Sequence, residues 1–327
     1  MRMIDIDVVV SWVDGTDAAH SRKRSNYIEL SGRDLHENAI NPHRWEESNE
    51  LYYCLRSIET NAPWARRIWI VTDNQVPELS HLPPDFRAKI QVVDHVEIFG
   101  EFGRYLPTFN SLAIETMMWR IAGLSEHFVY FNDDVFVTAP VAKTDFFVDG
   151  RPVLRGSWAD FTDLTRSSKH RMDPALMNHF NHIKAAEIMG YDARNLFFSA
   201  HAVHPMKKSV MEQLFAEHRE EFVENIKHRF RTTDQFLAQG LFNHACIRTG
   251  DISIKTKRDY LHLAVGACDA SSPHQAREYL LEAASPEIKL LCVNDLPAVE
   301  RKIHDVRKVL EQIIGSGSAA AARQSFH

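Results

Sequence analysis

The sequence is poor in the features that mark several large classes of protein. It has only 4 cysteines among 327 residues, and none forms a Cys-x-x-Cys pair, so neither a zinc knuckle nor a thioredoxin-like site is expected. Its 13 glycines show no triplet period, which excludes a collagen-like chain. The longest apolar runs, such as Val8 to Val10, fall far short of the roughly 20 residues that cross a bilayer, so no membrane-spanning helix is expected.

Charge and targeting signals exclude further classes. No apolar segment follows Met1, so we expect no secretory signal, a cytoplasmic location and reduced thiols. The chain carries 38 Lys and Arg against 44 Asp and Glu, a formal charge of −6, which argues against non-specific binding of nucleic acid. With 44% hydrophobic residues the chain can bury a sizeable core, and its length fits one large domain.

Strand and helix patterns alternate through the first half of the chain. Apolar, β-branched runs predict strands at 4–12, 67–72, 90–93 and 128–131, and helical spacing predicts helices at 48–60 and 111–121. Asn110 or Ser111 is the expected N-cap of the second helix. The polar segment 20–47 is interpreted as a surface excursion. This alternation indicates an α/β fold with a mostly parallel sheet flanked by helices.

The second half is predicted to be more helical. Helices are expected near 207–218, 233–244 and 297–314, while 150–200 mixes strand-like and loop-like pieces. A tail of Gly, Ser and Ala follows at 315–327 and is predicted to be disordered. No repeat or linker divides the chain, so 1–314 is expected to form a single domain.

Acidic residues follow several of the predicted strands. Asp14 follows the first strand, Asp73 the second, and the pair Asp133-Asp134 the last. Ligands of parallel sheets bind beyond the carboxyl ends of the strands, so these acids are candidates for one site. Adjacent carboxylates suit Mg²⁺ or Mn²⁺, which prefer oxygen ligands and bridge to phosphates. The alternative for each acid is a turn or Asx cap.

Histidine and arginine clusters supply further candidates. His201 and His204 could act as ligands or as an acid and base, or could simply cap backbone. Arg231 ends the basic segment 228–231 before a predicted helix, and arginine forks suit phosphate oxygens. The alternative there is a solvated basic face that balances nearby glutamates. No G-x-G-x-x-G, Walker or G-x-S-x-G pattern occurs, which disfavours a Rossmann cofactor, a P-loop and a serine hydrolase.

Four blocks of the chain resemble the Stealth family of hexose-1-phosphate transferases, which includes bacterial capsule phosphotransferases and the catalytic subunit of the lysosomal-enzyme N-acetylglucosamine-1-phosphotransferase. The blocks are residues 5–15; residues 50–59, 62–64, 70–77, 106–111, 123–128 and 130–134; residues 201–205 through 228–231; and residues 292–295. The first two are highly specific, whereas the last is short. Leu296-Pro297 departs from the family pattern after the fourth block, and 140–200 gives no match.

The resemblance implies a function and a fold. It implies a glycosyltransferase-like (GT-A-like) α/β core, a UDP-hexose donor such as UDP-N-acetylglucosamine, a glycan acceptor and a divalent cation, Mg²⁺ or Mn²⁺. The product would be a phosphodiester between two sugars, with release of UMP, in synthesis of a capsule or exopolysaccharide. Residues 1–140 would then bind the nucleotide-sugar and 141–314 the acceptor and phosphate. Peripheral attachment to a membrane assembly would be compatible with such a role.

The resemblance also implies roles for the candidate residues. One of Asp133 and Asp134 would bind the cation while the other accepts the proton of the acceptor hydroxyl, and the two roles stay unassigned between them. His204 would orient the phosphoryl group or be the base instead. Asn294 and Asp295 would complete the metal shell, and Arg231 and Arg56 would neutralise the diphosphate. The donor would be bound by Asp14, Asp73 and Asn110.

Two other functions stay open from the sequence. A metal-dependent glycosyltransferase would share the strand-end acids and the nucleotide-sugar donor but would release UDP. A non-catalytic carbohydrate-binding protein of a polysaccharide assembly would need neither the acid pair nor the arginine cluster.

Overall fold

The computed structural model describes residues 4–31, 35–41, 45–46 and 48–324. Its centre is a five-stranded sheet in the order β10-β4-β1-β2-β3. Four of these strands are parallel, namely β1 (Ile6–Ser11), β2 (Ile68–Thr72), β3 (Ile90–Asp94) and β4 (His127–Asn132). The edge strand β10 (His204–Lys207) runs antiparallel to β4. The predicted α/β class with a mostly parallel sheet is therefore confirmed.

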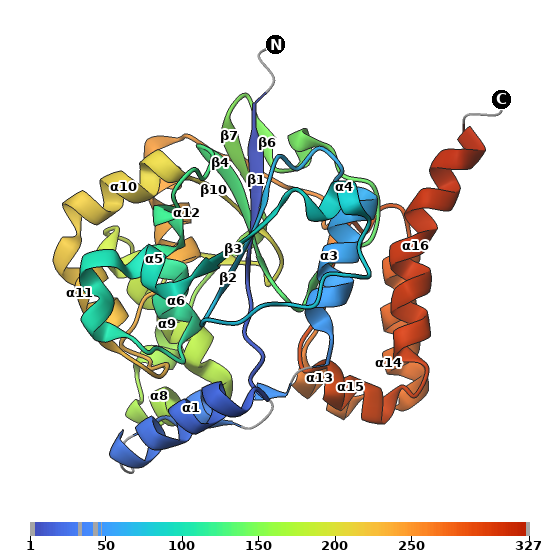
Figure 1. The fold of residues 1–327 in the computed structure, drawn as a ribbon. Coiled ribbons are helices and arrows are strands. Elements are labelled where there is room, and N and C mark those ends of the chain that lie inside the picture. The colour runs from blue at the N-terminus through green and yellow to red at the C-terminus, as the bar shows by residue number, and fades with distance from the viewer. Residues whose placement is uncertain (1–3, 32–34, 42–44, 47, 325–327) are drawn as a thin grey trace.

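Helices cover both faces of this sheet, and the alternation of side chains along β1 shows why (Figure 1). Val8 and Val10 pack into one core with α3 (Glu50–Asn61) and α16 (Val306–Gln324). Val9 points to the other face, into a second core with α6 (Ser111–Met117), α10 (Lys208–Glu217), α11 (Arg219–Lys227) and α12 (Ala238–Thr249). A strand buried on both faces needs apolar residues at nearly every position, and β1 has them apart from Asp7 and the terminal Ser11.

A smaller sheet, in the order β12-β13-β5, continues from the end of β4. Only two residues, Asp133 and Asp134, connect the end of β4 to the start of β5 (Val135–Val137). β13 (Leu290–Val293) pairs antiparallel with β5 and parallel with β12 (Tyr260–Leu263). This pairing brings the C-terminal residues 292–295 to the end of β4.

Short strands and helices complete the fold. The remaining strands are β6 (Phe147–Val148), β7 (Arg151–Leu154), β8 (Gly156–Ala159), β9 (Leu196–Ser199) and β11 (Ser253–Ile254). The remaining helices are α1 (Ala18–Ser31), α2 (Glu37–Ile40), α4 (Pro84–Arg87), α5 (His95–Phe99), α7 (Thr162–Thr165), α8 (Ser168–Met172), α9 (Met177–Ile188), α13 (Val265–Ala270), α14 (Pro273–Leu281) and α15 (Leu296–Lys302). Among the described residues, no helix combines the length and apolar character needed to span a bilayer.

Several predicted boundaries differ from the structure. The segment 20–47 contains α1, and the helix expected from 111 becomes 3₁₀ at Met118. The predicted helix 233–244 starts later, as α12, because the Asn225 and Gln235 side chains bond the backbone before it. The segment 297–314 holds parts of two helices, α15 and α16, separated at 303–305. α16 continues to Gln324, where a disordered tail was expected, and 325–327 lie outside the described residues.

The carboxylate of Asp7 generates a stability prediction. It is fully buried in β1 and accepts hydrogen bonds from Arg66 Nε and Nη2 (2.8 and 2.6 Å), Trp69 Nε1 (2.9 Å) and the Ser125 amide (2.9 Å). Asp7→Ala leaves these donors without an acceptor and is expected to lower the free energy of unfolding by about 2–4 kcal/mol. Urea unfolding measures the loss, with the exposed Asp5→Ala as control. A loss for Asp7→Ala no larger than the control's would contradict the account.

Candidate functional site

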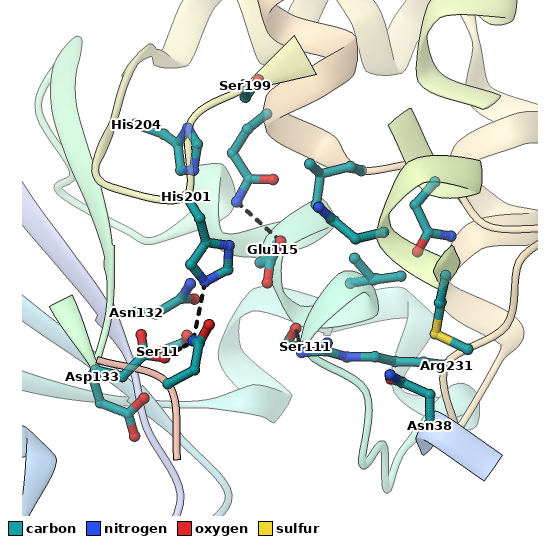
Figure 2. A pocket seen from close by; sticks show the side chains of 18 of the residues that line it. Ser11, Asn38, Ser111, Glu115, Asn132, Asp133, Ser199, His201, His204 and Arg231 are labelled. Atoms are coloured by element: carbon teal, nitrogen blue, oxygen red, sulfur yellow. Dashed lines mark hydrogen bonds between the residues drawn. The ribbon is translucent and has the colours of Figure 1, made fainter. Parts of the chain in front are cut away.

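The carboxyl edge of the central sheet opens into a cleft of about 1010 Å³. Its walls come from the end of β1, the start of α6, the β4–β5 connection, the segment between β9 and β10, and the residues after β13. Figure 2 shows His201 and His204 on one side of this cleft, Asp133 below them, and Ser111 with Arg231 across from them. Ligands of open α/β sheets bind at this edge, so the cleft is the candidate functional site.

The acid pair is held at the junction of the two sheets. The Val293 amide donates to the Asp134 carbonyl oxygen (3.0 Å), which ties the end of β13 to the β4–β5 connection. Asn294 Nδ2 then donates to Asp134 Oδ2 (2.5 Å), and Asp295 caps α15 through its Oδ1 and lines the same cleft. The structure thus brings Asn294 into contact with Asp134 and places Asp295, the third predicted metal residue, in the same cleft.

The donor set of this junction fits a hard divalent cation. Asp134 Oδ1 is buried and has no hydrogen-bond partner, and an orphaned buried carboxylate oxygen costs free energy unless a cation or a donor meets it. Asp133 adds a second carboxylate beside it, and oxygen atoms are the ligands that Mg²⁺ and Mn²⁺ prefer. Asn294 presents its amide nitrogen to Asp134, and its Oδ1 lies 2.5 Å from His262 Nε2. As a cation ligand it would therefore have to turn its amide over.

Arg231 interacts with two residues that were not among the candidate site residues. It forms a hydrogen bond with Ser111 and interacts electrostatically with Glu115. Its Nη2 donates to Ser111 Oγ. Glu115 lies one turn further along α6, is 4% exposed, and accepts hydrogen bonds from Gln239 Nε2 (2.9 Å) and the Tyr130 hydroxyl (3.3 Å). Burial raises the pKa of the Glu115 carboxyl, and the positive charge of Arg231 opposes this shift. The positive charge of Arg231 thus acts on a buried acid in the cleft.

A sequence signal for Glu115 does exist. It is the one charged residue in the stretch 112–118, and it lies four residues after Ser111, on the same face of the helix. A charged residue on a buried helix face needs a partner, which makes it a functional candidate. The helical pattern alone does not identify the partners of Glu115, which include Gln239 and Arg231.

His204 lies at the start of β10 with its ring stacked on Tyr130, the centroids 6.4 Å apart. Burial, together with the neighbouring His201, His182 and Arg155, lowers the pKa of His204 to about 3. The imidazole is therefore neutral at physiological pH and has little strength as a base. The hydroxyl of Tyr130 lies 2.8 Å from Ser11 Oγ and donates to Asn132 Oδ1 (2.6 Å), which fixes this wall of the cleft.

Three predicted donor residues do not line the cleft. Asp14 Oδ1 accepts from the amide and hydroxyl of Thr16 (2.8 and 2.6 Å), the Asx turn that the sequence left open as an alternative. Asp73 pairs with Lys23 Nζ (2.8 Å) and so ties α1 to the end of β2. Arg56 pairs with Glu59 (3.0 Å) on the exposed side of α3.

Asn110 does line the cleft, but its side chain serves the fold. Its Oδ1 caps α6 by accepting from the Leu112 amide (3.1 Å), as predicted for this position. Its Nδ2 donates to the His228 carbonyl oxygen (2.8 Å) and to Gln235 Oε1 (2.9 Å). These bonds hold the basic segment that carries Arg231 against the start of α6.

The fold and site define an α/β protein with a phosphate-compatible, acid-lined cleft at the edge of its sheet, and comparison with known proteins gives its family. Residues 44–153 match the family model described as Stealth protein CR2, conserved region 2. The capsular polysaccharide phosphotransferase LcbA of Neisseria meningitidis is 32% identical over 288 residues, which are 82% of this chain and 75% of the relative. The chain belongs to the Stealth family, which confirms the resemblance found in the four blocks.

Other curated relatives are longer than this chain. A capsular polysaccharide phosphotransferase of Haemophilus influenzae is 37% identical over 70% of this chain and 61% of the relative. An exopolysaccharide phosphotransferase of Streptomyces coelicolor is 34% identical over 89% of this chain but only 47% of the relative. The chain thus spans about half to three fifths of the length of these two relatives.

Solved structures with a similar arrangement include glycosyltransferases. The galactosyltransferase LgtC, in complex with donor and acceptor sugar analogs, superposes with a TM-score of 0.45 over 95% of both chains at 13% identity. Mouse xyloside xylosyltransferase 1 gives a TM-score of 0.39 at 10% identity, over 89% of this chain and 98% of the other.

The buried carboxyl of Glu115 generates a prediction about pH. Because its pKa is raised in the folded chain, the folded state binds the proton more tightly than the unfolded state, whose Glu pKa is about 4.3. This group therefore makes the stability of the wild type fall as pH rises above that value. Glu115→Gln has no charge to bury and is expected to melt above the wild type at pH 8 and to lose that advantage at pH 4.

Thermal unfolding at both pH values checks this expectation. The exposed Glu278→Gln serves as control and should show no pH-dependent difference from the wild type. A Glu115→Gln protein that melts below the wild type at pH 8 would show that the carboxylate stabilises the fold instead.

Proposed function

We propose that this chain transfers hexose-1-phosphate, with N-acetylglucosamine-1-phosphate as the favoured group, from a UDP-sugar to a hydroxyl of a glycan acceptor. One observation carries the proposal: a single cleft holds the acid pair Asp133-Asp134, the cation Arg231 and the neutral His204. The names of the relatives, capsular polysaccharide and exopolysaccharide phosphotransferases, support the same class of reaction. The setting would be synthesis of a surface polysaccharide on the cytoplasmic side, with peripheral attachment to a membrane assembly.

The proposed reaction breaks one phosphorus–oxygen bond and forms another. The acceptor oxygen attacks the β-phosphorus, the bond from that phosphorus to the bridging oxygen breaks, and UMP leaves with the bridging oxygen. The proton of the acceptor hydroxyl goes to a carboxylate of the acid pair. The bond between C1 of the hexose and its oxygen survives. Catalysis of this kind consists mainly of positioning the groups and stabilising negative charge.

The residues divide this work by charge. One carboxylate of Asp133 and Asp134 accepts the proton, and Arg231 neutralises the phosphate oxygens by the forked donation that guanidinium groups provide. With a pKa of about 3, His204 is better suited to orient a phosphoryl oxygen than to act as the base. The buried Glu115 adds a nearby acid that interacts electrostatically with Arg231.

Asp134, with Asn294 and Asp295, would hold Mg²⁺ or Mn²⁺. When bound, the cation would supply positive charge to the diphosphate. The acid pair belongs to 1–140, and Arg231 and His204 belong to 141–314, so both proposed halves meet in the cleft. We assign binding of the nucleotide-sugar to the first half, and binding of the acceptor and the phosphate to the second.

Replacing the orphaned carboxylate tests the assignment of Asp134. Asp134→Asn keeps the volume of the side chain but removes its negative charge, and it is expected to reduce UMP release from UDP-N-acetylglucosamine by at least about 10³-fold. The exposed Asp85→Asn is the matched control and should retain wild-type turnover. Chromatography that separates UMP from UDP measures the product. Full activity in a folded Asp134→Asn protein would refute the assignment.

A pair of arginine variants tests which cation meets the phosphate. Arg231→Ala is expected to lower kcat/KM for UMP release about 10²-fold or more, because a phosphate charge loses its partner. Arg56→Ala should change it little, since Arg56 is paired with Glu59 outside the cleft. Equal losses in the two variants would place Arg56 in the site after all, and an unchanged rate for Arg231→Ala would place that residue on a solvated face.

A further inference from the structure

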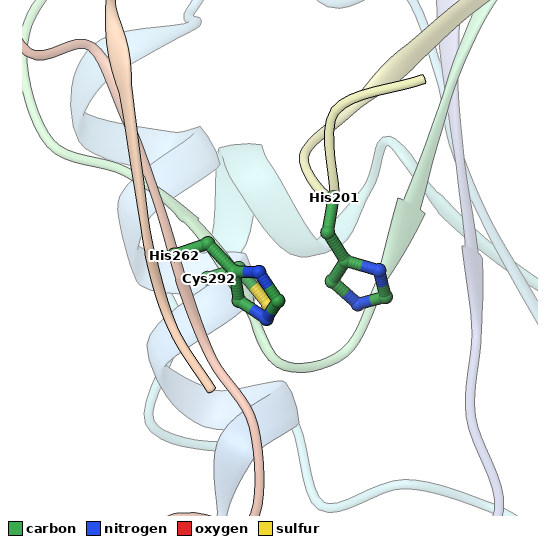
Figure 3. A group of neighbouring side chains, drawn as sticks. All are labelled: His201, His262 and Cys292. Carbon is green, nitrogen blue, oxygen red and sulfur yellow. The ribbon is translucent and has the colours of Figure 1, made fainter. Parts of the chain in front are cut away.

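Two histidines and a cysteine converge beside the acid pair, in a group that the proposed reaction does not use. His201 follows β9, His262 lies in β12, and Cys292 is its neighbour in β13 (Figure 3). One ligand atom from each residue lies within 4.8 Å of the others. The rings of His201 and His262 are stacked with centroids 4.7 Å apart.

We propose that His201, His262 and Cys292 form a binding site for a soft divalent cation such as Zn²⁺ or Co²⁺, separate from the oxygen ligands of the acid pair. Two imidazole nitrogens and a thiolate are ligands that such cations prefer, whereas Mg²⁺ prefers oxygen. Metal–ligand bonds of about 2.0–2.3 Å place tetrahedral ligands roughly 3.3–3.7 Å apart. The stacked imidazole rings would have to turn about their side-chain bonds to reach that geometry.

The location of the group favours partial, open coordination. Cys292 is fully buried between β5 and β12, while His201 and His262 are half-buried and line the cleft. Three protein ligands with a fourth position facing a cleft are typical of zinc sites that bind water or substrate. Binding would release the thiol proton to solvent as the sulfur–metal bond forms. The carboxylates of Asp133 and Asp134 nearby favour the arrival of positive charge.

Asn294 links this group to the acid pair. Its Oδ1 lies 2.5 Å from His262 Nε2, while its Nδ2 donates to Asp134 Oδ2 (2.5 Å) and lies 3.5 Å from Cys292 Sγ. A cation bound through His262 Nε2 would replace the contact with Asn294 and release the amide that contacts Asp134. Because one Asn294 side chain contacts both sites, two divalent charges bound there would lie close together and repel each other, so the two cations should compete.

Titration of the metal-free full-length chain with Co²⁺, without nucleotide, tests the proposal directly. One equivalent of Co²⁺ is expected to produce a near-ultraviolet thiolate-to-cobalt charge-transfer band. Zn²⁺ should abolish this band, and a large excess of Mg²⁺ should weaken Co²⁺ binding without producing any band of its own. The readout involves no substrate, so failure of the proposed transferase function would leave it unaffected.

Cysteine and histidine variants identify the ligands. Cys292→Ser is expected to lose the band, whereas Cys246→Ser, which alters a buried cysteine of α12, should keep it. His262→Gln should weaken Co²⁺ binding at least tenfold, and it decides the question if Cys292→Ser does not fold. No band in the wild type, or a band that persists in Cys292→Ser, would overturn the proposal. In that case the three side chains would be packing groups only.

Discussion

The pairing of β13 with β5 is the constraint on which the candidate site depends. β5 follows β4 directly after Asp133 and Asp134. A strand that pairs antiparallel with β5 therefore has its C-terminal end beside the acid pair. β13 does this from more than 150 residues further along the chain, and the bond from the Val293 amide to the Asp134 carbonyl oxygen fixes the register. Asn294 therefore reaches the Asp134 carboxylate, and Asp295 follows it in the same cleft, before any ligand contributes.

The opposite wall of the cleft depends on a separate balance of charge. Glu115 is buried in α6, where desolvation penalises its charge, and Arg231 reaches the same helix from the loop before α12. That loop is held by the side chains of Asn110, Asn225 and Gln235, which bond backbone groups rather than substrate. The residues that position the loop thus differ from Arg231, the residue that we propose for the phosphate. Burial lowers the pKa of His204 to about 3, so its imidazole carries no charge at physiological pH.

Local sequence patterns predicted the parallel sheet, because β1, β2 and β4 each contain a continuous apolar run, with Asp73 directly after β2 and Asp133 directly after β4. They also predicted Asp133 and Asp134 at a strand end and Asn110 as a helix cap. They could not show that Asp14 forms a turn and that Asp73 and Arg56 form ion pairs outside the cleft. A charged residue looks the same in the sequence whether it serves a turn, an ion pair or a binding site. Nor could these patterns reveal the partners of Glu115 or the group around His262, which depend on contacts between distant segments. The start of α12 was missed because side chains bond the backbone before it.

The central claim concerns which bond of the donor breaks, and an isotope label decides it most directly. UDP-N-acetylglucosamine labelled at the β-phosphorus would be incubated with the protein, Mg²⁺ and a panel of glycan acceptors, and the labelled products would be separated. The account predicts that the label moves to the acceptor and that unlabelled UMP is released in equal amount. Label that stays in UDP while the hexose alone is transferred would show glycosyl transfer and contradict the account.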